Sequence, residues 1–154
     1  MAFFNFAGKT KKFGDLTSHV TVEALCEQLK ILYREVNIID ENIIRIEDLN
    51  IDIWHEPKTF FVIEYRSRIP DFMEKFTDAE IINFCNDMNF KTLINCSFYR
   101  FDESVRVFHC KYPVFNIKHI RELNQLMIWF YQGVCAVFDD MEASFKNAED
   151  KKEL

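Results

Sequence analysis

The chain has 154 residues, of which 49% are hydrophobic and 16% aromatic, and its formal net charge is −6. This length and composition support one domain with its own hydrophobic core and exclude a largely disordered chain. The negative charge argues against a general nucleic-acid-binding surface, because such a surface needs clustered Lys and Arg.

The first 18 residues are predicted to form a flexible N-terminal arm that carries a short apolar run. No basic region precedes this run, so it does not have the pattern of a secretory signal peptide. The longest apolar-rich run, at 126–138, is shorter than the roughly 20 residues that cross a bilayer. Five cysteines without a C-x-x-C pair favour reduced thiols over disulfides. We therefore expect a cytoplasmic protein that does not contact a membrane.

The first helix is predicted to begin at Thr21, whose side chain can cap the helix. Apolar residues then recur at spacings of three and four, as on one face of a helix. They are Val22, Leu25, Leu29, Leu32 and Val36. One face of this helix is therefore expected to pack on the core.

Three strands are predicted next, because the period of the apolar residues changes to two. Ile44 and Ile46 belong to the first strand, Ile51 and Ile53 to the second, and residues 59–66 to the third. The links between them are short, as in antiparallel hairpins. These strands therefore predict a three-stranded meander.

A second helix is predicted from the sequence TDAE, where Thr77 and Glu80 have the spacing of a capping box. The residues of its expected buried face share a helical period. They are Ile81, Phe84, Cys85 and Met88.

A two-stranded hairpin is predicted to follow, with strands at 92–101 and 104–112. Asp102 and Glu103 would form the tight turn between them. Pro113 is expected to end the second strand, because proline has no N–H to donate to a neighbouring strand.

A long C-terminal helix is predicted from about residue 116 to residue 141 or slightly beyond. Its main apolar stripe consists of Ile120, Leu123, Met127, Phe130, Val134, Val137 and Met141. Further apolar residues lie on its other sides, so we expect part of this helix, or the second face of the sheet, to pack on a second copy of the chain. Gly133 inside the helix suggests close packing. Burial within the domain is the alternative.

The predicted element order is helix, three-stranded antiparallel meander, helix, two-stranded hairpin and long C-terminal helix. This order defines an α+β fold. It places a single domain at residues 19–147, followed by a charged tail at 148–154.

Three stretches of this sequence carry a resemblance to a known family. They are the helix turn INFCN, the hairpin KTLINCSFYRFDESVRVFHCKYPVF and the helix LNQLMIWFYQGVCAVFDDME. Over about residues 20–143 the chain resembles the YbjN family of bacterial proteins, which is similar to the type III secretion chaperone-like fold. The resemblance implies a dimeric α+β domain without an established enzymatic activity. Relatives of this kind are labelled sensory transduction regulators.

Asn83 and Asn86 match the N-x-x-N motif of that family. Residues three apart lie side by side on a helix, so the two amides could bond the backbone of an adjoining strand or of a partner chain. An amide has no useful acid–base chemistry near neutral pH. We therefore expect a structural use for this pair, with a ligand site as the alternative.

Protein contacts are expected on the sheet. Trp54 alternates with Ile51 and Ile53, which places it on the more polar sheet face, where a Trp suits a protein-binding surface. The alternative is that Trp54 packs against the helices or a second subunit. The candidate contact residues are Trp54, Phe60, Val62 and Tyr99.

No catalytic, cofactor-binding or metal-binding set is predicted. His109 and Cys110 are adjacent on a strand, so their side chains point to opposite faces and cannot activate each other. His119 and Glu122 are the only weak metal candidates, and the pattern of a dimetal carboxylate bundle is missing around them.

The sequence therefore favours a non-enzymatic, cytoplasmic, homodimeric protein that binds an unidentified polypeptide in a chaperone-like or regulatory role. The alternative is a small-ligand sensor. Its apolar pocket would lie between the long helix and the sheet, lined by residues such as Phe98, Phe108 and Trp129.

Overall fold

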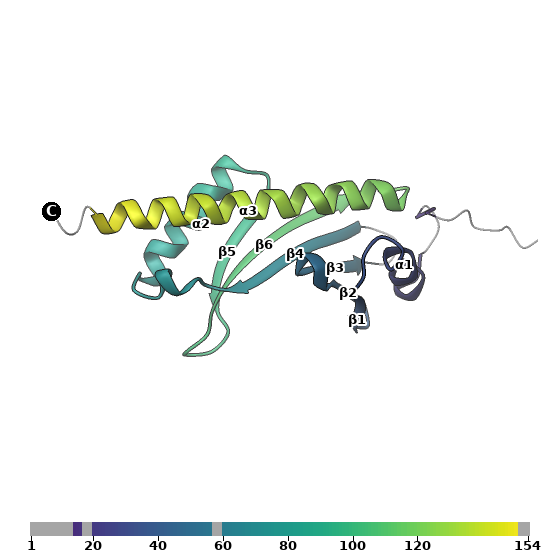
Figure 1. The fold of residues 1–154 in the computed structure, drawn as a ribbon, viewed down its shortest axis with the longest axis horizontal. Coiled ribbons are helices and arrows are strands. Elements are labelled where there is room, and N and C mark those ends of the chain that lie inside the picture. Colours follow the sequence, from purple (N-terminus) through teal and green to yellow (C-terminus); the bar gives the residue numbers. More distant parts are fainter. Residues whose placement is uncertain (1–13, 17–19, 57–59, 151–154) are drawn as a thin grey trace, which may run out of the picture.

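The computed structural model describes residues 14–16, 20–56 and 60–150. It contains one six-stranded antiparallel sheet with helices packed on it (Figure 1). The strand order is β1-β2-β3-β4-β6-β5. The predicted α+β class, with a first helix, a sheet and a long C-terminal helix, is confirmed.

The first helix, α1 (Val22–Leu29), begins where the sequence predicts, because Thr21 Oγ1 accepts a hydrogen bond from the backbone N–H of Ala24 at 3.2 Å. It ends sooner than predicted. Leu32 is 42% exposed, and Val36 begins a strand instead of continuing the helix. The prediction that the helix continues to Val36 was therefore wrong. Leu32 and Val36 have helical spacing by chance, and Val36 instead pairs with Ile46 in the sheet.

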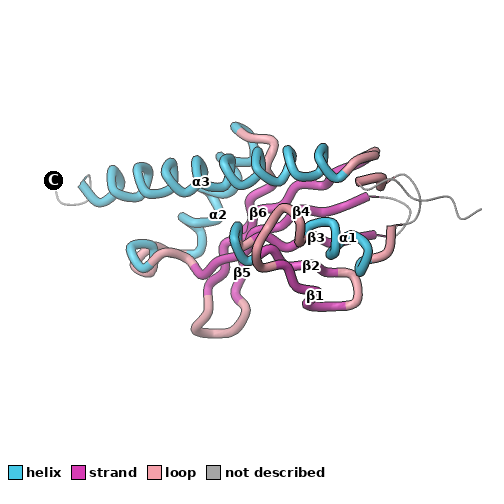
Figure 2. Tube along the Cα trace, turned by 45° about the vertical axis from the view of Figure 1, so that its right-hand side comes forward, coloured by secondary structure: helices cyan, strands magenta, loops and turns pink. Residues whose placement is uncertain are grey.

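The sheet has one strand more than predicted. The first four strands form a meander and the last two a hairpin (Figure 2). All neighbouring strands pair antiparallel. The strands are β1 (Val36–Asp40), β2 (Ile43–Ile46), β3 (Ile51–Glu56), β4 (Phe60–Arg68), β5 (Asn95–Arg100) and β6 (Arg106–Phe115). The added strand is β1, which lies at one edge, while β5 forms the other edge.

Pro113 does not end β6, which continues to Phe115 and pairs Pro113 with Val62 of β4. Backbone groups on a strand point alternately to its two neighbours. The nitrogen of Pro113 faces the side of β5, whose pairing with β6 already ends at Lys111. The missing N–H therefore costs no ladder bond, and the prediction that Pro113 stops the strand was wrong.

The second helix, α2 (Asp78–Lys91), has the predicted capping box between Thr77 and Glu80. Its predicted buried face is confirmed, because Ile81, Phe84, Cys85 and Met88 are all at most 7% exposed. This face packs towards β5 and towards the end of the long helix.

The long helix, α3 (Ile120–Asp150), crosses the whole length of the sheet (Figure 1). All seven residues of its predicted stripe are at most 2% exposed. The helix starts four residues later than predicted and ends nine residues later than Met141, so it includes the start of the predicted tail. Its added end is held by Phe145, which packs on Phe76 and Phe84 with ring centroids 4.5 and 5.7 Å apart.

The start of α3 is tied to residues just before the first helix. Leu16 donates its N–H to the carbonyl of Lys118 at 2.9 Å, and Ile120 donates to the carbonyl of Gly14 at 2.8 Å. Residues 14–16 therefore belong to the folded domain, and the rest of the predicted arm lies outside the described residues.

Much of the extra apolar surface of α3 is used inside the domain. Phe138 packs edge-on against both Tyr65 and Phe108 of the sheet. A side chain at Gly133 would collide with the side chain of Ile94, so the glycine allows Ile94 of the same chain to pack closely against α3. Ile128 and Trp129 remain 43% and 38% exposed. The structure thus supports the domain-internal alternative for most of the helix.

In the described part of the chain, no helix is both long enough and apolar enough to span a membrane.

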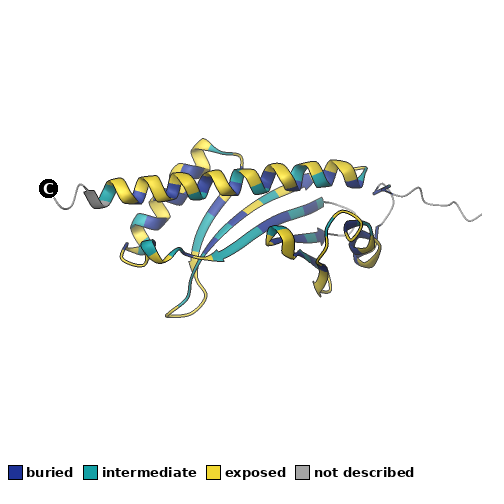
Figure 3. Cartoon of the chain, viewed as in Figure 1, coloured by how far each residue is buried: buried dark blue, intermediate teal, exposed yellow. Residues whose placement is uncertain are grey.

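The two faces of the sheet differ in what covers them. One face meets the helices and carries the fully buried Ile44, Ile53, Ile63 and Cys110 (Figure 3). The α1 and α3 helices lie on this face, and Tyr33, in the turn that follows α1, donates a 2.5 Å hydrogen bond from its Oη to Asn124 Oδ1 of α3. Among the described residues, no helix packs on the other face, which we call the open face.

Candidate functional site

The open face carries a hollow of about 330 Å³ near the start of β4 and the end of β6. The pairing register brings its apolar residues together, because Trp54 lies opposite Val62, which lies opposite Pro113. Phe60 joins them from the next position on this face, and its ring lies tilted against that of Phe115 with ring centroids 5.4 Å apart. Glu64 and Lys111 form the charged rim of the hollow.

Trp54 lies on the predicted face, opposite in direction to the fully buried Ile51 and Ile53. It is half-buried. The guanidinium of Arg66 lies over its ring at 5.9 Å from the centroid. The buried Nε1 of Trp54 has no hydrogen-bond partner, so this indole has an unused donor on the open face.

A band of charged residues crosses the open face beside the hollow. Arg45 holds Asp52 through two hydrogen bonds of 2.6 and 2.7 Å. Glu64 pairs with Arg66, and its Oε1 lies 3.6 Å from Nε2 of His109. Asp52 and Glu64 are only 4% and 8% exposed, so their charges are balanced locally. The open face therefore combines an apolar end with a neutralised polar band.

Glu64 stays ionised in this band. Burial is the largest single influence and favours the neutral acid, but the nearby His109 ring, the hydrogen bond from Arg66 and the positive charge of Arg66 together outweigh it. The pKa of Glu64 is therefore lowered from its usual value of 4.5. Its carboxylate therefore places a negative charge at the rim of the apolar hollow.

The four predicted contact residues do not form one cluster. Trp54, Phe60 and Val62 line the same hollow. Tyr99 shares their face but lies on the edge strand β5, where its ring contacts His109 at 6.2 Å between centroids and is 37% exposed. The polar band separates Tyr99 from the hollow.

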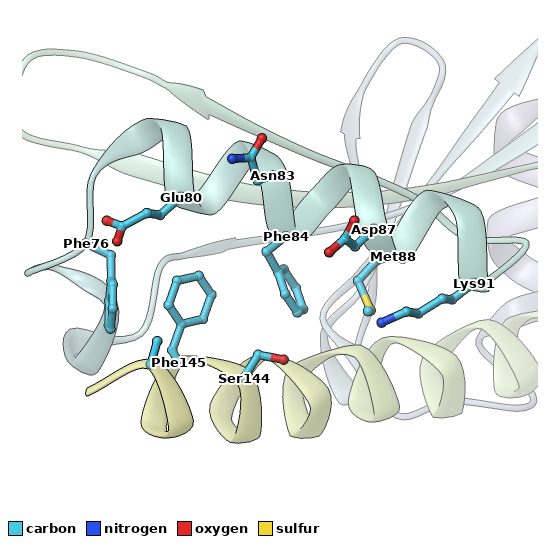
Figure 4. Close-up of a pocket in the computed structure, with 10 residues that line it drawn as sticks. Phe76, Glu80, Asn83, Phe84, Asp87, Met88, Lys91, Ser144 and Phe145 are labelled. Carbon is cyan, nitrogen blue, oxygen red and sulfur yellow. The ribbon is translucent and has the colours of Figure 1, made fainter. Parts of the chain in front are cut away.

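A second hollow, of about 280 Å³, lies between α2 and the end of α3 (Figure 4). Phe76, Phe84 and Phe145 turn towards one another in this space. Asn83 is exposed and lies on the rim farthest from α3. Asn86 is also exposed.

A different asparagine makes the backbone contact that we expected from Asn83 and Asn86. Asn89 Nδ2 donates to the carbonyl of Cys96 at 2.9 Å, and its Oδ1 accepts from the N–H of Cys96 at 2.6 Å. This side chain therefore holds the outer edge of β5. The signal available in the sequence was the position of Asn89 in the last turn of the helix, beside the following strand.

The residues of the predicted sensor pocket fall into separate contacts. Phe108 is fully buried and packs edge-on against Phe138. Phe98 lies under the guanidinium of Arg106, 5.8 Å from its ring centroid. Trp129 contacts Tyr112 with ring centroids 5.1 Å apart. None of the three lines either hollow described above.

The weak metal candidates take part in starting α3. Glu122 Oε2 accepts from the N–H of His119 at 3.3 Å, and His119 Nδ1 accepts from the N–H of Arg121 at 3.1 Å. These bonds satisfy the first N–H groups of the helix. Within the described ranges, no group of three or more His, Cys, Asp or Glu is placed to hold a metal ion.

His109 and Cys110 point to opposite faces as predicted, with Cys110 fully buried and His109 on the open face. The prediction did not consider that Cys110 would meet another cysteine. Cys96 lies opposite it on β5.

Comparisons with protein-family models, curated proteins and solved structures give no match. The resemblance to the YbjN family therefore stays a prediction that depends on the sequence motifs.

Proposed function

We propose that this chain is a non-enzymatic protein-binding domain that holds a segment of another polypeptide on the open face of its sheet. The observation that carries the proposal is the hollow between Trp54, Phe60 and Val62, on a face that no described helix covers. Aromatic side chains with one polar end are favoured at protein-binding surfaces. The proposal includes a chaperone-like or regulatory role in the cytoplasm.

The chemistry of the hollow defines the segment that it would accept. Its walls are apolar, and its volume of about 330 Å³ suits one large apolar side chain. Lys111 is exposed on the rim, whereas Glu64 is already paired with Arg66. The expected partner segment therefore has an aromatic or large aliphatic residue next to an acidic one.

The homodimer belongs to the same proposal, and the helix side of the molecule supports it. Phe90 and Leu93, at the end of α2, are 92% and 76% exposed. Ile94 lies against Gly133, so this end of α2 adjoins α3 near the partly exposed Trp129. A second copy would cover these apolar side chains.

The dimer is tested by light scattering of the purified chain. We expect the mass of two copies, and a single-copy mass for the double substitution Phe90→Asp with Leu93→Asp. A monomer at micromolar concentration in the unchanged chain would contradict the dimer and leave the open-face proposal standing.

Peptide binding is tested with a set of labelled synthetic peptides that carry a central Trp, Phe or Leu, with and without a flanking Asp. Fluorescence anisotropy should rise most for the peptides with an acidic flank. Trp54→Ala should weaken this binding at least tenfold, and Lys111→Ala should remove the preference for the acidic flank. Trp129→Ala is the matched control, because it removes the other tryptophan from the opposite side.

Equal binding by the Trp54→Ala and Trp129→Ala variants would contradict the open-face proposal. Aggregation of a heat-unfolded model protein gives a second readout. The unchanged chain should suppress it, and Trp54→Ala should not.

A small-ligand sensor is the second candidate, and the hollow between α2 and α3 favours it. Its apolar floor includes Phe84, Met88 and Phe145, and Glu80 and Lys91 supply polar groups at its rim. A ligand that binds there would raise the melting temperature of the chain. We expect Phe84→Ala to abolish such a rise and Trp54→Ala to preserve it, which distinguishes this site from the open face.

A further inference from the structure

Two buried thiols face each other between β5 and β6. Cys96 lies directly opposite Cys110, and their Sγ atoms are 3.8 Å apart. They are 2% and 0% exposed. Both belong to the helix-covered face, away from the proposed peptide-binding hollow.

The hydrogen bonds of Asn89 define the geometry of this pair. Because its amide occupies both the N–H and the carbonyl of Cys96, these groups point outward from the sheet and not towards β6. Cys96 and Cys110 are therefore a pair without mutual backbone hydrogen bonds, the arrangement in which opposite Cα atoms are about 4.5 Å apart. That separation falls within the range that disulfides span, about 4.4–6.8 Å.

The two thiols differ in their readiness to ionise. A hydrogen bond from Cys110 lowers the pKa of Cys96 and outweighs the effect of burial. The same hydrogen bond, together with burial, raises the pKa of Cys110. Burial also raises the pKa of nearby Cys85 to about 12. Cys96 is thus the thiol that would react first.

We propose that Cys96 and Cys110 form a reversible intrachain disulfide when the chain meets a hydroperoxide. The site is independent of what the open face binds. Disulfides are rare in reducing compartments, and those that occur there are usually transient and catalytic or redox-sensing.

The chemistry needs one hydroperoxide for each disulfide. The Cys96 thiolate attacks the terminal peroxide oxygen, the O–O bond breaks, and the alcohol or water leaves with a proton, so that Cys96 becomes a sulfenic acid. The Cys110 sulfur then attacks the Cys96 sulfur, and the sulfenic oxygen leaves as water with the Cys110 proton. The two sulfurs lose two electrons in total, and the peroxide gains them. A small dithiol reverses the reaction by thiol–disulfide exchange.

The edge position of β5 provides the route for the oxidant. The strand has six residues, only one neighbouring strand, and the side chain of Asn89 along its outer edge. Local opening at such edges requires less free energy than opening of the core. We therefore expect oxidation to be slow in the unchanged chain and faster in Asn89→Ala.

The test starts from Cys135→Ser, because Cys135 is the one exposed cysteine of the five. The full-length protein is treated with hydrogen peroxide, unfolded in denaturant so that every buried free thiol becomes accessible, blocked with N-ethylmaleimide and mapped by peptide mass spectrometry. We expect two of the four remaining thiols to escape blocking, one cross-linked peptide containing Cys96 and Cys110, and full recovery after dithiothreitol. The oxidised protein should also melt at a higher temperature, because the disulfide restricts the unfolded chain.

Cys110→Ala is the second variant. It should stop at a Cys96 sulfenic acid that dimedone traps, whereas Cys96→Ala should give no dimedone adduct at Cys110. A Cys85–Cys96 cross-link, a disulfide between chains, or four thiols that all stay reduced would overturn the proposal. Because the cross-link is measured in a chain that retains both cysteines, misfolding of either Ala variant does not affect this result.

Discussion

The helix-covered face and the open face of the sheet are built from the same strands but differ in burial and in the kinds of side chain that they carry. On β4, Ile63 points to the helices and is fully buried, whereas its neighbour Val62 points to the open face and is half-buried. The covered face is almost entirely apolar. The open face instead combines an apolar hollow with the ion pairs Arg45–Asp52 and Glu64–Arg66.

Because of this difference, we expect the covered face to stabilise the fold and the open face to bind a partner. Burial of apolar surface is the largest favourable contribution to folding, so the covered face should hold most of the stability. Side chains on the open face contribute less to folding, and their chemistry is therefore free to serve a partner. Substitutions on the covered face should mainly lower stability, whereas substitutions on the open face should mainly weaken partner binding.

The largest effect is expected for Ile63→Ala compared with Val62→Ala. Ile63→Ala leaves a cavity under α3 and should lower the free energy of unfolding by about 2–5 kcal/mol. Val62→Ala should cost only about 1 kcal/mol, because its side chain is half-buried already. Urea unfolding followed by circular dichroism measures both, and equal losses would show that the open face is covered in solution.

A smaller effect is expected for Asn89→Ala, which tests how the edge of the sheet is held. Two hydrogen bonds to Cys96 are lost, so the free energy of unfolding should fall by about 1–2 kcal/mol. Amide exchange in β5 should speed up while exchange in β3 does not. The matched control is Asn86→Ala on the exposed side of the same helix, which should change stability by less than about 0.5 kcal/mol. Similar losses for both variants would contradict the role of Asn89.

The smallest effect is the dependence on pH at Glu64. Its pKa is lower in the folded chain than its usual value of 4.5, so Glu64 stabilises the fold above pH 4.5. That contribution is lost as the pH falls through the lowered folded pKa. We therefore expect Glu64→Gln to be less stable than the unchanged chain at pH 7 and to lose this difference in acid. Thermal melting of both proteins from pH 7 to pH 3 measures it, and a constant difference would contradict the ion-pair explanation.

Local signals in the sequence predicted the helices well. Thr21 and the Thr77–Glu80 capping box mark helix starts that the structure confirms. The stripe from Ile120 to Met141 is buried throughout. These signals succeed because capping and helical periodicity involve residues at most four positions apart.

Pairing between strands was harder to predict. In the hairpin, the predicted turn is one residue too short, which changes every cross-strand pair. A turn of only Asp102 and Glu103 would place Cys96 opposite His109. The actual turn is one residue longer, because Phe101 donates its N–H to the carbonyl of Val105 at 2.9 Å and Asp102 Oδ1 accepts from the N–H groups of Ser104 and Val105. Cys96 therefore meets Cys110 instead.

The sequence by itself determined the α+β class, the starts of α1 and α2, the buried stripe of α3 and the face on which Trp54 lies, because each depends on the order and period of neighbouring residues. Only the tertiary structure decided that β1 joins the sheet, that Asn89 holds β5 and that Cys96 meets Cys110. It also gathered Trp54, Phe60 and Val62 at one hollow and left Tyr99 apart. These outcomes depend on the register between strands, which is set by turn length and by packing across the whole sheet.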